Sequence, residues 1–124
     1  MTKIPIISIV DDDKSGRIAL SSLVRSMGYA PFLFSCAEDF LASAERNNTE
    51  CLITDVQMPG MSGLDLHCEL LNAGQNIPTI FITAYPEESL RRRANAAGAM
   101  CFLSKPVDGE VIIDCIERIF AIYQ

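Results

Sequence analysis

The chain has little positive charge. Its 10 Lys and Arg residues stand against 16 Asp and Glu residues, which gives a formal net charge of -6. A protein surface that binds nucleic acid needs a basic face, so this composition argues against DNA binding by these residues. A membrane span is missing as well, because no apolar run approaches the roughly 20 residues that cross a bilayer. The first residues turn acidic too quickly for a secretory leader, and we therefore expect a cytoplasmic location.

Closely spaced cysteine pairs are also absent. The sequence has five cysteines with no C-x-x-C pair, and several of them lie in apolar runs: Cys36, Cys51, Cys68, Cys101 and Cys115. Because the number is odd and no leader is recognised, we expect reduced thiols that pack as small buried side chains, and no disulfide framework. The single histidine, His67, lies away from any other ligand-type cluster, so we do not expect it to bind metal or accept a phosphoryl group.

What the chain does contain is a regular alternation of short apolar runs and helical patterns. Its 124 residues and 49% hydrophobic content predict one domain with its own core. Strands are predicted at residues 4–10, 30–34, 51–54, 77–83 and 99–103, and a helical pattern follows each of them. This alternation predicts an α/β fold with a five-stranded parallel sheet between two layers of helices. The expected strand order, 2-1-3-4-5, is taken over from known doubly wound folds of the flavodoxin-like type.

Local signals mark two helix starts. Ser35 and Glu38 have the spacing of a capping box, and Pro86 is expected in the first turn of the fourth helix. Two i,i+4 ion pairs are predicted on that helix, Glu87 with Arg91 and Glu88 with Arg92. The three consecutive arginines at residues 91–93 are therefore interpreted as a solvated helix face rather than a binding patch.

Polar residues follow the ends of four predicted strands. Asp11 and Asp12 follow the first, Asp55 the third, Thr83 ends the fourth, and Lys105 follows the fifth. Because the carboxyl ends of parallel strands meet at one edge of the sheet, where ligands bind in open α/β folds, these side chains are expected to converge there. Asp55 precedes a loop rich in Pro, Gly and Ser, and it is the first candidate for a functional carboxylate.

Converging carboxylates need a cation. Two of them about 4 Å apart repel by roughly 4 kcal/mol at an effective dielectric constant near 20. Lys105 can offset one of the three negative charges of Asp11, Asp12 and Asp55, and a divalent ion would neutralise the rest. A cluster of oxygen ligands without His or Cys suits a hard ion such as Mg²⁺. A carboxylate flanked by Mg²⁺, a lysine and a hydroxyl group can act as a nucleophile toward a phosphoryl group.

The residues that carry this chemistry resemble those of a known family. Residues 10–13, 55–63, 81–84 and 102–106 resemble, in order and spacing, the four signature stretches of the receiver (CheY-like) domain of two-component response regulators. The resemblance spans essentially all of residues 1–124 and is strongest to the receivers of LuxR-type helix-turn-helix transcription regulators. It implies a domain that accepts a phosphoryl group from a sensor histidine kinase or a phosphotransfer protein. Its only implied reactions are self-phosphorylation and slow autodephosphorylation, so it is not expected to be an enzyme.

The resemblance also implies a metal site. Asp55 would be the phosphoacceptor, and Asp12, Asp55 and the backbone carbonyl of Gln57 would hold Mg²⁺ or Mn²⁺. Asp11 would support the ion through a water molecule. Asp13, where Glu is frequent in the family, would either add to this outer shell or face solvent.

Three further residues have roles implied by the resemblance. Lys105, which precedes a proline in a peptide bond expected to be cis, would pair with the phosphoryl oxygens, and the Thr83 hydroxyl would bond to one of them. Phe102 would be the switch aromatic that turns inward when Thr83 moves. The surface of the fourth helix, fifth strand and last helix would then change and pair with a second copy of the chain.

Several alternatives remain open at this stage. Taken alone, residues 11–13 would be a solvated helix start, Lys105 a surface lysine and Thr83 an ordinary strand end. As a whole, the chain is either the receiver half of a transcription regulator whose output domain follows Gln124 or a stand-alone receiver that shuttles phosphate or docks on a partner. A third alternative, a phosphatase with an aspartyl nucleophile, would need an acid two residues after Asp55, where this sequence has Gln57.

Overall fold

The computed structural model describes residues 4–123, and within them strands and helices alternate as predicted. The elements are β1 Ile6–Val10, α1 Lys14–Ser26, β2 Ala30–Phe34, α2 Ala37–Ala42, a 3₁₀ helix η1 Ala44–Asn47, β3 Thr49–Asp55, α3 Gly63–Asn72, β4 Thr79–Thr83, α4 Glu88–Ala96, β5 Cys101–Ser104 and α5 Gly109–Tyr123. The strands form one parallel sheet in the order β2-β1-β3-β4-β5, which confirms the predicted topology. The predictions that concern the first three residues and the end of the domain at Gln124 lie outside the described residues.

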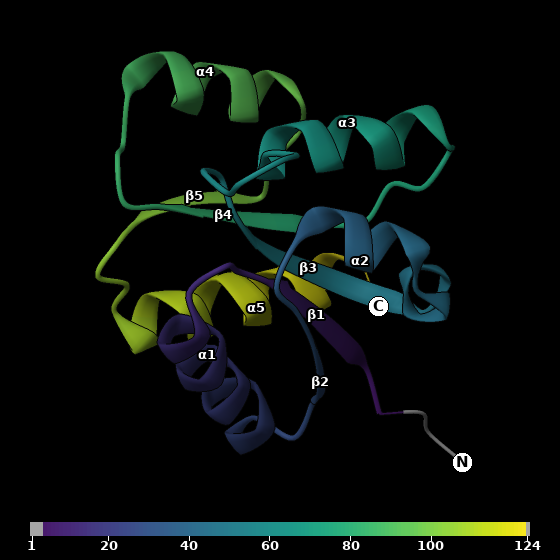
Figure 1. Ribbon diagram of the computed structural model, residues 1–124. Helices are drawn as coiled ribbons and strands as arrows, with labels where there is room; N and C mark the ends of the chain where they lie inside the picture. The colour runs from purple at the N-terminus through teal and green to yellow at the C-terminus, as the bar shows by residue number, and fades with distance from the viewer. Residues whose placement is uncertain (1–3, 124) are drawn as a thin grey trace.

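Helices cover both faces of the sheet (Figure 1). The helices α1 and α5 lie on one face, and α2, α3 and α4 lie on the other. The strands read as continuous apolar runs because alternate side chains enter the two cores. Ile9, Ile53 and Ile82, for example, pack toward α1 and α5, whereas Val10 and Leu52 pack toward α2 and α3. No helix among residues 4–123 has the length and apolar character that a membrane crossing requires.

The two predicted helix starts are wrong in detail. The residue that caps α2 is Cys36 rather than Ser35, and its side chain accepts no capping hydrogen bond. Glu38 instead accepts a hydrogen bond from the backbone N–H of Met61, 3.3 Å away, so the capping box is not formed. Glu87 is extended and caps α4, which leaves Pro86 outside the first turn.

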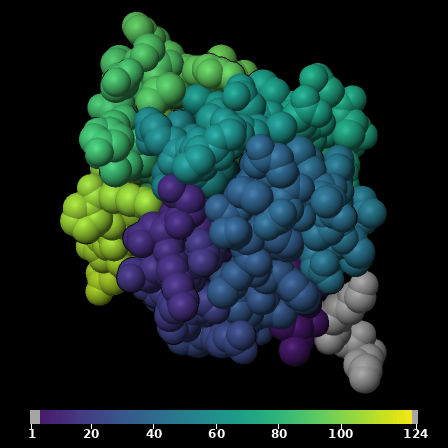
Figure 2. Space-filling view, in the orientation of Figure 1, coloured from purple at the N-terminus to yellow at the C-terminus, as the bar shows by residue number. Residues whose placement is uncertain are grey.

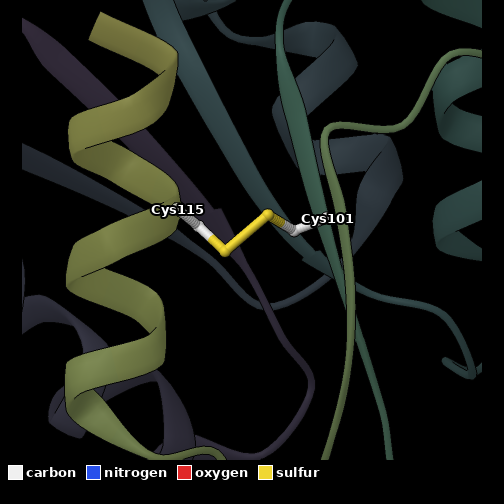
Figure 3. Close-up of a disulfide and its surroundings, with 2 residues drawn as sticks. All are labelled: Cys101 and Cys115. Atoms are coloured by element: carbon white, nitrogen blue, oxygen red, sulfur yellow. A yellow bond between two sulfur atoms is a disulfide. The ribbon is translucent and has the colours of Figure 1, made fainter. Parts of the chain in front are cut away.

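The expectation for the cysteines is wrong for two of the five. Cys101 on β5 and Cys115 on α5 form a disulfide, with their Cα atoms 6.6 Å apart (Figure 3). The spacing in the sequence did not predict this pair, because it depends on how α5 crosses the sheet beneath β5. Among the free cysteines Cys51 is buried, as expected, whereas Cys68 is exposed.

The arginines of α4 have other partners than predicted. Among the described residues neither predicted i,i+4 pair is formed, and Arg91 instead lies 3.9 Å from Glu88, three residues before it. Arg93 Nη2 donates to Asp65 Oδ1 at 2.9 Å and so ties α4 to α3. The guanidinium group of Arg91 lies over the ring of Phe102, 5.1 Å from its centre, as in a cation–π contact. Arg93 therefore contacts α3 and Arg91 contacts β5, because α4 packs beside both elements.

Candidate functional site

The strand ends bring three charged side chains into contact. Asp11 follows β1, Asp55 ends β3 and Lys105 follows β5, and the parallel registers align these ends at one edge of the sheet. Lys105 Nζ donates to Asp55 Oδ2 at 3.0 Å and to Asp11 Oδ2 at 3.3 Å. Both carboxylates are almost fully buried, so this convergence is built into the core of the domain and is not a surface ion pair. The bond from Lys105 to the following proline is cis, as the resemblance implies.

The third carboxylate completes a candidate cation site. Asp11, Asp12 and Asp55 each offer one carboxylate oxygen, and these three atoms lie within 4.8 Å of one another. Asp12 is exposed, whereas the other two are buried. This donor set contains only oxygen, so the residues present fit a hard divalent ion such as Mg²⁺. The role of the Gln57 backbone carbonyl as a ligand stays a prediction.

Burial and neighbouring charges shift the pKa values of Asp55 and Lys105. Burial, followed by the repulsion of Asp11 and Asp12, raises the pKa of Asp55 to about 6, although Lys105 acts in the opposite direction. Burial lowers the pKa of Lys105, but its hydrogen bonds and charge interactions with Asp55 and Asp11 outweigh this effect and raise it overall. One ammonium group is shared by two buried carboxylates, those of Asp55 and Asp11. A second cation would relieve this imbalance.

The position of Asp55 depends on close packing that the sequence analysis did not single out. A Cβ atom at Gly63, the first residue of α3, would lie 2.1 Å from the backbone oxygen of Asp55. The N–H of Gly63 donates to the Val56 carbonyl at 2.9 Å. Only glycine therefore allows α3 to start this close to the strand end. Asp13, interpreted as an outer-shell or solvent-facing residue, caps α1 by accepting a hydrogen bond from the Gly16 N–H.

The Thr83 hydroxyl makes two hydrogen bonds to uncharged groups. The Thr83 side chain is fully buried. The Thr83 hydroxyl donates to Gln57 Oε1 at 2.5 Å and accepts from the backbone N–H of Tyr85 at 3.0 Å. The family resemblance implies a role for the backbone carbonyl of Gln57 only, and this contact of its side chain was not predicted. One feature of the sequence could have indicated the contact. Gln57 follows the end of β3 by two residues, and β3 lies beside β4, which ends at Thr83.

Phe102 belongs to an apolar cluster on the strand next to that of Thr83. In the register of β4 and β5 it is opposite Phe81, and Thr83 is opposite Ser104, so Phe102 and Thr83 lie on the same face of the sheet. The Phe102 side chain is 8% exposed and packs with Val56, Leu64, Phe81 and Ala94. In this structure the aromatic side chain therefore points inward, beneath Arg91.

A cleft gives access to the charged side chains. It has a volume of about 590 Å³, and its lining comes from the start of α1, the segment after β5 and the start of α5: Asp11, Asp13, Gly16, Ala19, Leu20, Leu23, Ile82, Lys105, Pro106, Val107, Gly109 and Ile112. Figure 2 shows the purple start of the chain's first helix between the teal segment that follows β3 and the yellow-green C-terminal region. A group of some size can therefore approach Lys105 and Asp11 from outside.

Comparisons with known proteins agree on one family. The family model described as "Response regulator receiver domain" matches residues 7–117. Response regulator protein TodT of Pseudomonas putida is 43% identical over 111 residues, which are 90% of this chain and 49% of TodT. Transcriptional regulatory protein FixJ of Rhizobium meliloti is 38% identical over 112 residues, 90% of this chain and 55% of FixJ. The chain thus spans about half the length of the curated relatives that it matches.

A solved structure extends this agreement to three dimensions. The structure of the response regulator StyR has a TM-score of 0.88 and 38% sequence identity to this chain. The similarity covers 97% of this chain and 61% of the StyR chain. Fold and sequence therefore point to the same family.

Proposed function

Because this chain belongs to the response regulator receiver domain family of two-component signalling, we propose that Asp55 is its phosphoacceptor. The observation that carries the proposal is the contact of Asp55 Oδ2 with Lys105 Nζ, 3.0 Å away, beside the buried Asp11 and the exposed Asp12. Phosphorylation on an aspartate is the function of the family, and a sensor histidine kinase is the partner that it implies. We extend the domain to residues 1–124 and place it in the cytoplasm.

The proposed reaction is a phosphoryl transfer to a carboxylate. A carboxylate oxygen of Asp55 attacks the phosphorus of a phosphohistidine, and a P–O bond forms while the P–N bond breaks. The imidazole nitrogen keeps the electron pair of the broken bond and takes up a proton. Lys105 donates hydrogen bonds to the transferring oxygens, whose charge it stabilises. Water later attacks the acyl phosphate slowly, which releases inorganic phosphate and restores the carboxylate of Asp55.

The cluster of acids also supports a metal cofactor. Receiver domains bind Mg²⁺ at an acidic pocket, and in this chain Asp11, Asp12 and Asp55 form such a cluster. We assign Asp12, Asp55 and the backbone carbonyl of Gln57 as ligands of Mg²⁺ or Mn²⁺, with Asp11 acting through water. When bound, the ion supplies the positive charge that the carboxylates and the phosphoryl oxygens lack.

The signal would leave the site through Thr83 and Phe102. Their position on the face of the sheet that α4 covers supports a path from the phosphoryl group to α4 and β5. The helix α5, which covers the opposite face, would complete the surface that responds. That surface would then pair with a second copy or control an output domain. Since FixJ is named a transcriptional regulatory protein, we propose transcription regulation as the output of the whole protein.

The test is the mass of the intact protein after incubation with acetyl phosphate and Mg²⁺. We expect the wild type to gain one phosphoryl group only when Mg²⁺ is present, and Asp55→Asn to gain none. Asp39→Asn, which removes an exposed acid on α2, is the matched control and should behave as the wild type does. A gain of mass in Asp55→Asn would overturn the assignment. Absence of any gain in the wild type would indicate an interaction module that works without phosphate.

A further inference from the structure

Gln57 holds the hydroxyl group on which the proposed switch depends. Its side chain comes from the loop after β3 and reaches Thr83 at the end of β4. The Thr83 hydroxyl donates its hydrogen to Gln57 Oε1 at 2.5 Å, and its oxygen accepts from the Tyr85 N–H at 3.0 Å. Thr83 is fully buried, so water does not compete with these bonds.

This arrangement occupies the only donor in the Thr83 side chain. A hydroxyl group carries a single hydrogen, and here that hydrogen is directed at Gln57. Thr83 can therefore donate to a phosphoryl oxygen on Asp55 only after it gives up the contact with Gln57. A buried polar atom that loses its partner is costly, so Gln57 needs a new position when Thr83 leaves it.

The structure offers such a position. A second cleft of about 500 Å³ lies between the loop after β3 and α4, and Gln57 is part of its lining together with Val56, Leu64, Leu90 and Arg93. Gln57 is half-buried, and it both accepts the hydrogen bond from Thr83 and lines this cleft. Its side chain can thus turn from the hydroxyl group into an open, partly polar space beside α4.

We propose that Gln57 is a positioning residue that holds Thr83 in its unphosphorylated arrangement and sets how readily the domain switches. The inference rests on the proposed function, because it assigns a regulator to the same site. Phosphorylation of Asp55 exchanges one acceptor of the Thr83 hydrogen for another. The strength of the bond to Gln57 then opposes the switch, and weakening that bond favours it.

The test is the affinity for beryllofluoride in the presence of Mg²⁺, followed through the NMR signals of the Thr83 and Phe102 amides. Gln57→Met keeps the length of the side chain and removes the acceptor. We expect it to lower the dissociation constant about two- to tenfold, the range that the loss of one ordinary competing hydrogen bond gives. Gln57→Ala, which also removes the acceptor, should shift the affinity in the same direction even if Met packs poorly.

Two controls separate this effect from a structural one. Gln75→Met removes a glutamine that binds Arg46 elsewhere in the fold, and it should leave the affinity unchanged. The change at Gln57 should also disappear in a Thr83→Val background, because no hydroxyl remains to be held there. An equal effect of Gln57→Met with and without the hydroxyl would overturn the inference, as would an unchanged affinity of both Gln57 variants.

The same experiment keeps the inference apart from the proposed function. If the wild type binds beryllofluoride and the Gln57 variants bind it equally well, only the role of Gln57 is wrong. If the wild type with Mg²⁺ binds no beryllofluoride, the phosphoacceptor site itself is wrong and the role of Gln57 falls with it.

Discussion

The site has a charged half and a neutral half that are built differently. In the charged half, Lys105 contacts Asp55 and Asp11, so one ammonium group serves two buried carboxylates, and Lys105 and Asp11 line the cleft between α1 and α5. The neutral half, Thr83 with Gln57 and the Tyr85 amide, faces α4, and its hydroxyl group is already satisfied. The first half is therefore suited to attract a cation and a phosphoryl group. The second is suited to exchange one hydrogen bond for another.

The difference separates chemistry from response. A charged group acts on every oxygen of an approaching phosphoryl group, and its effect is large because the site is buried. A neutral hydrogen bond that replaces another of the same kind changes the free energy little, and it can therefore be reversed. We expect substitutions in the charged half to change phosphoryl uptake strongly and substitutions in the neutral half to change mainly the conformational response.

Lys105→Met should produce the largest effect. It keeps the alkyl chain and removes the ammonium group that contacts both Asp55 and Asp11. Removal of one preorganised donor to a developing anion lowers rates by about 10²–10³, so phosphorylation by acetyl phosphate at saturating Mg²⁺ should slow by about that factor. Lys14→Met removes an exposed lysine from the start of α1 and should leave the rate unchanged. A change below about threefold for Lys105→Met would contradict the role of the charged half.

Gly63→Ala should damage both halves together. The new methyl group would lie 2.1 Å from the Asp55 backbone oxygen, so either β3 or α3 must shift. Overpacking of this kind costs about 1–3 kcal/mol, and contact with backbone places it at the upper end. Urea unfolding measures the loss. Gly109→Ala, whose Cβ would have ordinary contacts with Leu23, should change the free energy of unfolding by less than about 1 kcal/mol. Equal losses in the two variants would show that α3 tolerates the methyl group.

Asp55→Asn should stabilise the protein when divalent ions are removed by EDTA. The pKa of Asp55 is raised to about 6 in the folded state, above its value in the unfolded chain, so the folded state binds the proton more readily. Stability then falls as the pH rises from about 4 to about 6 and stays at the lower level above that range. At pH 7 the variant avoids this loss, and we expect a gain of about 1–3 kcal/mol in the free energy of unfolding.

The pH dependence provides the control for that gain. Urea unfolding at pH 7 and at pH 4.5 should show that the advantage of Asp55→Asn shrinks at the lower pH, where the wild-type carboxyl is protonated. An advantage that is the same at both pH values would show that it does not arise from the charge of Asp55.

The charged half could be predicted from the sequence, and much of the neutral half could not. Apolar runs that end in Asp11 and Asp55 fix strand ends, and a parallel sheet brings such ends to one edge whatever the side chains do there. The Gln57 contact depends on the path of a loop and on one side-chain rotamer. No periodicity in the sequence records either of them.

The same distinction explains the errors in the fold. The alternation of strands and helices follows from patterns repeated over many residues and was predicted well, whereas the correct strand order was taken over from known doubly wound folds. The disulfide between Cys101 and Cys115 requires the crossing angle of α5 on the sheet, which no local pattern contains. The observed start of α2 lies one residue later than predicted, so the N-cap residue is Cys36 and not Ser35.

The most direct test of the separation between the two halves is Thr83→Val, measured in two ways on the same samples. The variant keeps the shape of the side chain and removes the hydroxyl group that contacts Gln57. We expect phosphoryl uptake, read from intact mass, to stay within about tenfold of the wild type, since one neutral hydrogen bond is lost. The change in the NMR signal of the Phe102 amide on phosphorylation should disappear. A loss of uptake as severe as that of Lys105→Met, or a Phe102 response that persists without the hydroxyl group, would contradict the account.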